Sequence, residues 1–369
     1  MSIKSLTPLI LCALLGGIAC TDPVAPTYNF RAGFLVVDGR ITDQTGYSYV
    51  TIDRNVEQFG EYRLVPQAGA RVTSQDDRGE VLTWLPSDTV GYYLPPPGFA
   101  AEGDRSYTLR IETAEGELIE SPPQALPPKV PFRNLRYRFD QEAYYSENRK
   151  RFVPAFTFLV DVDDPAGEQN YYQYRFRTWE RVDVCMTCRR SRYRNGQCVE
   201  EPDTRQVDYW DYLCDVDCWA TNIGAGRKIY RDEFSDGSTV TGIEAGRVDF
   251  ARLGGLLFEV EQANISSRAY DYAEILDNLA NNSGGLNAPL PAPLVGNLSD
   301  ASELGTYVLG FVSVESLTVD RVYFNRGDVA GASLPNPYTV KLEPVVPSPP
   351  TAPCEGGNRT STEPAGWME

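Results

Sequence analysis

Hydrophobic and polar residues alternate along most of the first third of the chain. Leu35 and Val37 fall on one face of an extended segment, and Asp38 falls on the other. Similar short runs, separated by turn residues, cover 49–53, 70–74, 80–84, 106–112 and 118–119. Short strands at this spacing predict an antiparallel β-sandwich domain over residues 34–125.

The pattern of alternation resumes after a proline-rich stretch, residues 126–134, which predicts an extended linker. The next strand-like runs are 135–139, 155–162, 171–182, 228–234, 247–265, 307–314 and 318–325. One segment, 268–280, instead repeats its hydrophobic residues at helical spacing and is predicted to be the only substantial helix. Residues 135–343 are therefore predicted to form a second β-rich domain.

The predicted fold class is mainly β, with two antiparallel β-sandwich domains of the immunoglobulin or transthyretin type and one helix in the second. Residues 344–369 are rich in proline and poor in hydrophobic residues, so a disordered tail is predicted there.

Two strands of the second domain are predicted to carry charges on a single face. In the run 171–182, Arg175 and Arg177 share one face, and aromatic residues occupy the other. In the later run, Glu259 and Glu261 lie opposite a hydrophobic face. Both segments therefore have the pattern of half-buried strands.

The N-terminus carries an export signal. Residues 6–18 form an apolar run too short to span a bilayer, and the sequence Gly17-Ile18-Ala19-Cys20 follows the pattern of a lipobox. We expect residues 1–19 to be a signal peptide, Cys20 to be lipidated, and 20–33 to be a tether. The protein would then be anchored to a membrane through acyl chains. The alternative is an ordinary signal peptide with an incidental cysteine.

Composition disfavours several classes of function. The formal net charge is −17, so nucleic acid is an unsuitable partner, because its phosphates would be repelled. The chain has no histidine, which removes the Ser-His-Asp and Cys-His arrangements of nucleophilic catalysis. We therefore expect no cofactor and no catalytic residues.

A cysteine-rich insertion is predicted over residues 183–220. Its spacing, with two pairs of closely spaced cysteines, resembles a zinc ribbon, and a redox CxxC centre is a third interpretation. An even number of cysteines in an exported chain favours disulfides, and one bridge would tie the tail to the body. The disulfide candidates are Cys185, Cys188, Cys198, Cys214, Cys218 and Cys354.

Acidic residues are crowded at the end of the run 155–162. Asp161, Asp163 and Asp164 could supply oxygen ligands to Ca²⁺, or a pair of carboxylates for glycoside hydrolysis. The preferred interpretation is a solvated turn without a metal, because Pro165 interrupts the pattern of a calcium loop.

Aromatic residues are concentrated beside the cysteines. Tyr209, Trp210, Tyr212 and Trp219 are predicted to form a binding surface, because exposed loops on a rigid scaffold commonly bind ligands or partners. The alternative is that these side chains pack in the interior.

The order of several short motifs resembles a known family. The motifs are the lipobox, 35–43 (LVVDGRITD), 106–111 (SYTLRI) with Glu115-Gly116, Cys218-Trp219, 268–272 (RAYDY), 295–298 (VGNL) and 308–312 (VLGFV). Together they resemble the Bacteroidota outer-membrane lipoproteins catalogued as domain of unknown function 4249 (DUF4249). The family has no general assigned activity, but its members tend to be encoded beside TonB-dependent receptors. The resemblance therefore implies an accessory role in nutrient capture or import.

The functional expectation is thus a non-catalytic lipoprotein of the outer membrane, acting with a TonB-dependent receptor. The alternative is a free-standing surface protein that binds carbohydrate or peptide. The identity of its ligand does not follow from the sequence.

Overall fold

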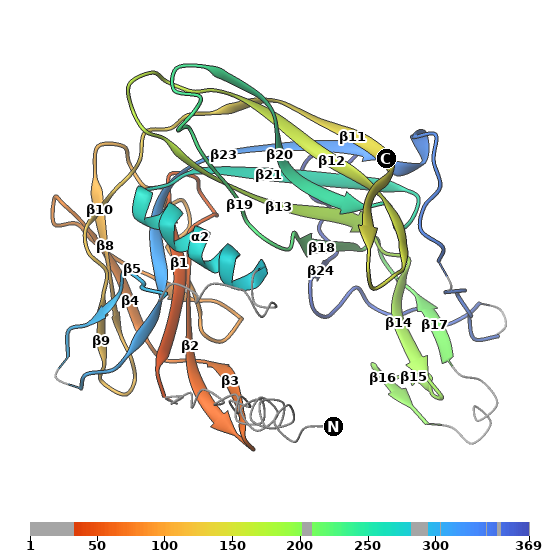
Figure 1. Ribbon diagram of the computed structural model, residues 1–369. Coiled ribbons are helices and arrows are strands. Elements are labelled where there is room, and N and C mark those ends of the chain that lie inside the picture. Colours follow the sequence, from red (N-terminus) through yellow and green to blue (C-terminus); the bar gives the residue numbers. More distant parts are fainter. Residues whose placement is uncertain are drawn as a thin grey trace, which may run out of the picture.

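The computed structural model describes residues 33–200, 209–281, 294–302, 304–336, 338–344 and 348–368. The protein is mainly β, and an eleven-stranded sheet, called the large sheet below, runs through the described residues (Figure 1). Its strands are β1 (Leu35–Thr42), β2 (Tyr49–Gln58), β3 (Glu61–Pro66), β6 (Leu85–Pro86), β7 (Tyr92–Leu94), β13 (Tyr171–Arg181), β18 (Trp219–Ile223), β19 (Lys228–Arg231), β21 (Gly255–Asn264), β23 (Val308–Asn325) and β24 (Arg359–Thr360).

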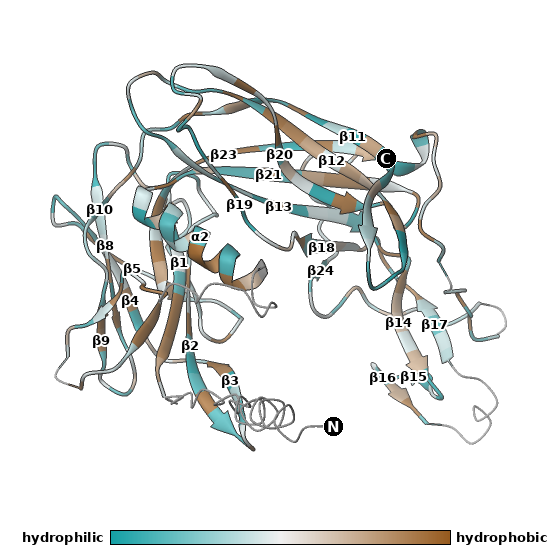
Figure 2. Cartoon of the chain, viewed as in Figure 1, coloured by the Kyte–Doolittle hydropathy of each residue, from teal (hydrophilic) through white to brown (hydrophobic). Residues whose placement is uncertain are grey.

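Two smaller sheets cover the same face of the large sheet at different ends. The first contains β4 (Arg71–Asp76), β5 (Val81–Thr83), β8 (Ser106–Glu112), β9 (Leu118–Glu120), β10 (Gln124–Ala125) and β22 (Ser299–Asp300). The second contains β11 (Phe132–Ser146), β12 (Arg151–Asp163) and β20 (Thr239–Asp249). Each encloses a hydrophobic core, one with Val37 against Leu109 and the other with Phe158 against Phe258. Burial of one strand face in these cores explains the alternation seen in the sequence, and hydrophobic and hydrophilic residues follow each other along β2 in Figure 2.

The two halves of the molecule share strand β23 of the large sheet. The first half of β23 pairs in parallel with β1, and its second half pairs antiparallel with β21. One continuous strand therefore serves both cores, and two independent sandwich domains are not confirmed. The predicted linker is anchored to the body at two points, because Val130 and Phe132 are buried and Val130 donates its backbone N–H to the Asn264 side chain at 3.2 Å.

The helix α2 (Ser267–Asn281) confirms the prediction for 268–280. It packs on the face of the large sheet that the smaller sheets leave free, where Tyr272 stacks on Phe311 with ring centres 5.0 Å apart. Figure 1 shows α2 in the inner angle of a bent molecule. We call this side of the large sheet the inner face.

Two glycine motifs mark the place where β23 meets β1. A Cβ on Gly310 would lie 1.8 Å from the Val37 carbonyl oxygen, and a Cβ on Gly296 would lie 1.9 Å from the Gly310 carbonyl oxygen. Next to them, the Asn297 side chain accepts from the backbone N–H of Val312 at 3.0 Å and donates to its carbonyl at 2.7 Å. The Asn297 side chain thus makes the two backbone hydrogen bonds that a neighbouring strand would otherwise make. The motifs at 295–298 and 308–312 are therefore one structural unit.

The cysteine-rich insertion forms an arm of two hairpin-like sheets. These pair β14 (Val184–Arg189) with β17 (Tyr209–Leu213), and β15 (Arg192–Arg194) with β16 (Gln197–Val199). A short 3₁₀ helix, η3 (Arg326–Asp328), follows β23.

The prediction of a disordered tail is wrong for residues 348–368. Ala352 is fully buried, Cys354 is bonded to Cys218, and β24 pairs with β18. The tail has few hydrophobic residues, but a disulfide and a strand partner hold it, and local composition carries neither of these constraints.

Candidate functional site

The inner face is polar, although it lies in the middle of the large sheet. Directly paired residues of neighbouring strands point to the same side, so the registers fix which side chains share this face. Its central residues are Asp38, Arg40, Arg175, Arg177, Trp179, Ile223, Glu259, Glu261, Ser313, Glu315 and Arg321.

Arginines and glutamates alternate across the strands in a continuous array. Arg40 contacts Glu261 at 2.7 Å, and Arg177 contacts Glu261 at 2.6 Å and Glu259 at 2.7 Å. Arg321 completes the array with a contact of 2.6 Å to Glu259. The carboxylates are buried, whereas the side chains of Arg177 and Arg321 are each 31% exposed. Charged N–H groups are therefore presented to solvent over a buried acidic layer.

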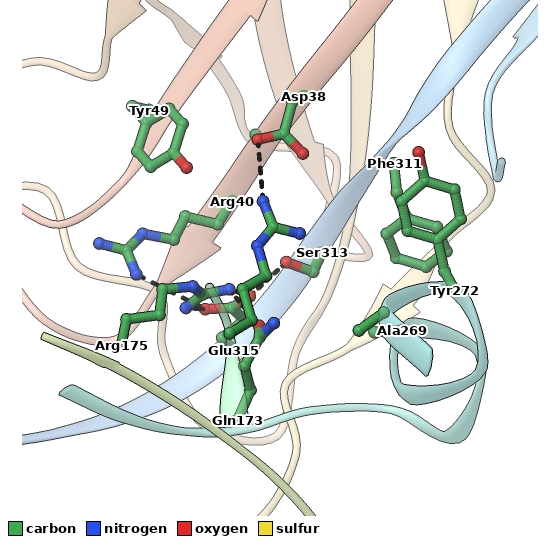
Figure 3. A pocket seen from close by; sticks show the side chains of 13 residues that line it. Asp38, Arg40, Tyr49, Gln173, Arg175, Ala269, Tyr272, Phe311, Ser313 and Glu315 are labelled. Atoms are coloured by element: carbon green, nitrogen blue, oxygen red, sulfur yellow. Dashed lines mark hydrogen bonds and ion pairs between the residues drawn. The ribbon is translucent and has the colours of Figure 1, made fainter. Parts of the chain in front are cut away.

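A second ion pair adjoins this array. Arg175 holds both carboxylate oxygens of Glu315 at 2.8 Å, and Arg40 lies 3.9 Å from the same carboxylate (Figure 3). Burial alone would raise the pKa of Glu315, but the positive charges of Arg175 and Arg40 outweigh it and lower this pKa to about 2. Glu315 is therefore fixed as an anion and is unsuited to proton transfer near neutral pH.

Aromatic rings lie beside the arginines. The Arg177 guanidinium is 5.1 Å from the ring centre of Tyr47 and 5.8 Å from that of Trp179. The Arg321 guanidinium lies 5.1 Å from the ring centre of Trp179. These cation–π contacts stiffen the array and surround it with flat hydrophobic surface. Such a mixture of Arg, Tyr and Trp is typical of protein-binding surfaces.

A small hollow lies between β1 and α2. Figure 3 shows Asp38, Tyr272 and Phe311 around it, and Arg227 lies 3.6 Å from the Asp38 carboxylate. Burial raises the pKa of Asp38, and the Arg227 charge opposes this shift. The hollow has a volume of about 20 Å³, enough for one water molecule and too small for an organic substrate.

Glu315→Gln tests the buried ion pair. At pH 7 this variant is expected to lose about 2 kcal/mol of unfolding free energy, because Arg175 keeps its charge while its partner becomes neutral. The ordinary pKa of Glu315 is 4.5 and its folded pKa is about 2, so its contribution is complete above about pH 4.5 and is lost as the pH falls toward 2.

Urea unfolding of both proteins between pH 7 and pH 3 measures this effect. The difference between wild type and Glu315→Gln should shrink below pH 4.5. A suitable control is Glu120→Gln, since the exposed Glu120 side chain lies 3.4 Å from the exposed Arg110, and a loss of about 0.5 kcal/mol or less is expected. A difference that does not change with pH would contradict the assignment of Glu315.

The six candidate cysteines form three disulfides, as predicted. The pairs are Cys185–Cys214, Cys188–Cys198 and Cys218–Cys354. The sulfurs of Cys185, Cys218 and Cys354 lie within 4.8 Å of one another, because two of the bridges are adjacent. Since every one of these sulfurs is oxidised, the set offers no thiolate to zinc, and the disulfide interpretation is the correct one.

The predicted aromatic binding surface is wrong for three of its four residues. Trp210, Tyr212 and Trp219 are 8%, 0% and 4% exposed and pack around the disulfides and the tail. Tyr209 is half-buried and stacks on Tyr338 with ring centres 5.6 Å apart. The arm has little other hydrophobic material for a core, so its aromatic residues supply one.

The three aspartates of the calcium alternative do not converge on one point. Asp161 accepts hydrogen bonds from Arg136 and Asn134, Asp163 pairs with Arg133, and buried Asp164 accepts from the Tyr172 hydroxyl. The Arg136 and Arg133 hydrogen bonds lower the pKa values of Asp161 and Asp163 to about 2. Protein donors therefore occupy both oxygens of Asp161 and both oxygens of Asp163, which a cation would need. Carboxyl groups of this pKa are also poor general acids.

A larger groove lies where the tail crosses the end of the large sheet. It has a volume of about 500 Å³ and is lined by Arg181, Asp183, Arg252, Leu253, Gly254, Gly255, Tyr323, Arg326 and Trp367. Trp367 lies edge-on to Tyr323 at 5.1 Å, and Arg326 is buried against Glu180 at 2.9 Å. Its arginines are largely paired within the protein, and its two aromatic rings, both half-buried, offer flat surfaces on which a ligand ring can stack.

The predicted signal peptide, Cys20 and the tether up to residue 32 lie outside the described residues. Among the described residues, no helix is both long and apolar enough to span a membrane.

Fold and site together define a disulfide-containing, mainly β protein that presents a rigid arginine- and aromatic-rich face. A comparison with family-wide sequence patterns matches residues 21–320 to "Domain of unknown function (DUF4249)". The chain belongs to this family, as its motifs indicated. No curated protein matches the chain.

The charged strand faces that form the inner face were recognisable in the sequence, but their association was not. The alternating pattern places Arg175 and Arg177 on one face of their strand, and it does the same for Glu259 and Glu261. That these charges form ion pairs follows only from the pairing of β13 with β21, which sets Arg175 opposite Glu261 and Arg177 opposite Glu259.

Proposed function

We propose that this protein is an outer-membrane lipoprotein that acts as a non-catalytic binding subunit of a TonB-dependent receptor in nutrient capture or import. Acyl chains on Cys20 would hold it to the membrane. Three disulfides suit an exported protein, because such bonds persist in oxidising compartments. The DUF4249 resemblance supports the receptor as partner.

The inner face is the observation that carries this proposal. It combines partly exposed arginines and the half-buried ring of Tyr47 with an exposed hydrophobic residue, since Ile223 is 84% exposed and pairs with Arg177. The array beneath is rigid, so little conformational freedom would be lost on binding. The small volume of the hollow beside α2 favours a protein partner over a buried substrate.

A pull-down in mild detergent tests the partnership. The tagged lipoprotein is recovered from its own outer membrane, and mass spectrometry identifies what accompanies it. Stoichiometric recovery of a large β-barrel receptor is the expected result. Recovery of the lipoprotein alone, under conditions that preserve other barrel complexes, would overturn the proposal.

The variant Ile223→Asp locates the interface. A buried carboxylate at the contact should lower receptor recovery roughly tenfold or more, because unpaired charge is costly in an interface core. Val81→Asp is the matched control, since Val81 is 57% exposed on β5, in a sheet that covers the opposite face. Equal loss of receptor in both variants, with both folded, would show that the inner face is not the interface.

The groove beside Trp367 favours a second candidate, a free-standing surface protein that binds carbohydrate or peptide. A sugar ring or an aromatic side chain would stack on Trp367 and Tyr323. Screening an array of glycans and peptides tests this candidate, and binding should disappear in Trp367→Ala. Glycoside hydrolysis that disappears in Asp163→Asn would contradict both binding functions.

A further inference from the structure

Among the described residues, no further layer of the fold lies over the β2–β3 hairpin. β1 begins at Leu35, opposite Arg54, so the hairpin beyond Arg54 has no strand of β1 beside it. Every residue of β3 is exposed, and Figure 1 shows the hairpin extending from the large sheet at the lower edge of the molecule. A two-stranded ribbon of this kind gains little stability from its own contacts in water.

The hairpin nevertheless carries hydrophobic side chains. Phe59, at the turn, is 95% exposed, and Tyr62 and Leu64 are 41% and 54% exposed. Phe59 adopts a left-handed backbone conformation with φ of 57°, which is unfavourable for a residue with a Cβ. The turn therefore places a large apolar ring at the outermost point of a strained ribbon. Exposed groups of this kind mark contact sites.

The start of the described chain is fixed at the base of the same hairpin. The Gly33 backbone N–H donates to the Asn55 carbonyl at 2.8 Å, and Arg54 Nη1 donates to the Gly33 carbonyl at 3.0 Å. Gly33 follows Cys20 by thirteen residues in the sequence. Fully extended, this segment reaches about 45 Å at most, so a membrane that held Cys20 would lie within that distance of the hairpin base.

We propose that the tip of the β2–β3 hairpin docks on the lipid surface of the membrane that holds the acyl chains, with Phe59 inserted among the lipids. The inference rests on the proposed lipid anchor at Cys20. Glu57 and Glu61 outnumber Arg63 on the hairpin, so attraction to anionic headgroups is absent and the contact is apolar. A few apolar side chains bind lipid weakly, so docking depends on the tether, which keeps the hairpin at high effective concentration near the surface.

Fluorescence quenching by brominated lipid tests this contact. Acylated Phe59→Trp protein is reconstituted into phosphatidylcholine vesicles with or without brominated acyl chains, and subtraction of the wild-type signal isolates the introduced indole. Phe234→Trp is the matched control, because Phe234 is also 95% exposed but lies in the turn between β19 and β20. Figure 1 shows this turn at the top of the molecule, far from the hairpin.

The indole introduced by Phe59→Trp is expected to lose most of its emission in brominated vesicles, whereas the indole of the Phe234→Trp control keeps its emission. The non-acylated Phe59→Trp chain should show no quenching, since the contact needs the tether. An unquenched hairpin indole in protein that floats with the vesicles would overturn the docking proposal and leave the anchor intact. Protein that does not float when produced with its own N-terminus would instead contradict the anchor. Equal quenching in the two acylated variants would also overturn the proposal.

Discussion

Replacing Gly310 with alanine is expected to lower the free energy of unfolding by about 4 kcal/mol, the sum of backbone strain and a steric clash. Gly310 has φ of +113°, a conformation that residues with a Cβ rarely adopt. The added methyl would also lie 1.8 Å from the Val37 carbonyl oxygen, so β1 and β23 would have to separate. Since β23 serves both hydrophobic cores, its displacement should weaken both.

Gly116→Ala is the control for this prediction. Gly116 has φ of +89°, but no atom lies within 4 Å of its expected Cβ. This variant has the strain without the clash and should lose about 1 kcal/mol. Urea unfolding followed by circular dichroism gives both values. Similar losses in the two variants would show that β23 does not approach β1 as closely as the structure indicates.

Sequence pattern predicted the class of fold because strands buried on one face repeat with a period of two. The helix at 268–280 was predicted for the corresponding reason, its hydrophobic spacing. The pairing of β1 with β23 was not predictable in this way, because the two strands are about 270 residues apart and no local pattern encodes their register. The prediction of two sandwiches therefore did not include the strand that their cores share.

Burial of the aromatic residues in the cysteine-rich arm shows a different limit. Tyr212 and Trp219 occur in a polar, loop-like stretch, which is typical of exposed segments. Their burial depends on Cys354, a residue far along the chain that brings the tail against them. The cysteines indicated that disulfides form, but the pairing that builds this small core depends on tertiary structure.

The charged inner face also has a structural role. Arg40 belongs to β1 and Glu261 to β21, and their contact joins the two halves of the molecule across 221 residues of sequence. A buried ion pair often adds little net stability compared with hydrophobic packing, whereas loss of one partner is costly. The array is therefore better suited to fixing the relative position of the halves than to strengthening the fold. A fixed angle between them is what a preformed protein-binding face requires.

Removing the Cys218–Cys354 bridge, in the double variant Cys218→Ser with Cys354→Ser, is expected to lower the unfolding free energy by about 4 kcal/mol. This bridge closes a loop with a sequence separation of 136, so it restricts the unfolded chain strongly. In the folded state it holds the tail, in which β24 pairs with β18 and Trp367 packs edge-on against Trp219 at 6.1 Å. Loss of the bridge should therefore also expose Trp219 and shift its fluorescence to longer wavelength.

The double variant Cys188→Ser with Cys198→Ser is the matched control, because its bridge has a sequence separation of 10. It should lose about 2 kcal/mol and leave the fluorescence of Trp219 unchanged. Urea unfolding and limited proteolysis measure the two effects, and early cleavage of the tail is expected only without the Cys218–Cys354 bridge. If the tail stays protected without it, the contacts of β24 and Trp367 suffice to hold the tail. The groove beside Trp367 would then be independent of the redox state of the compartment.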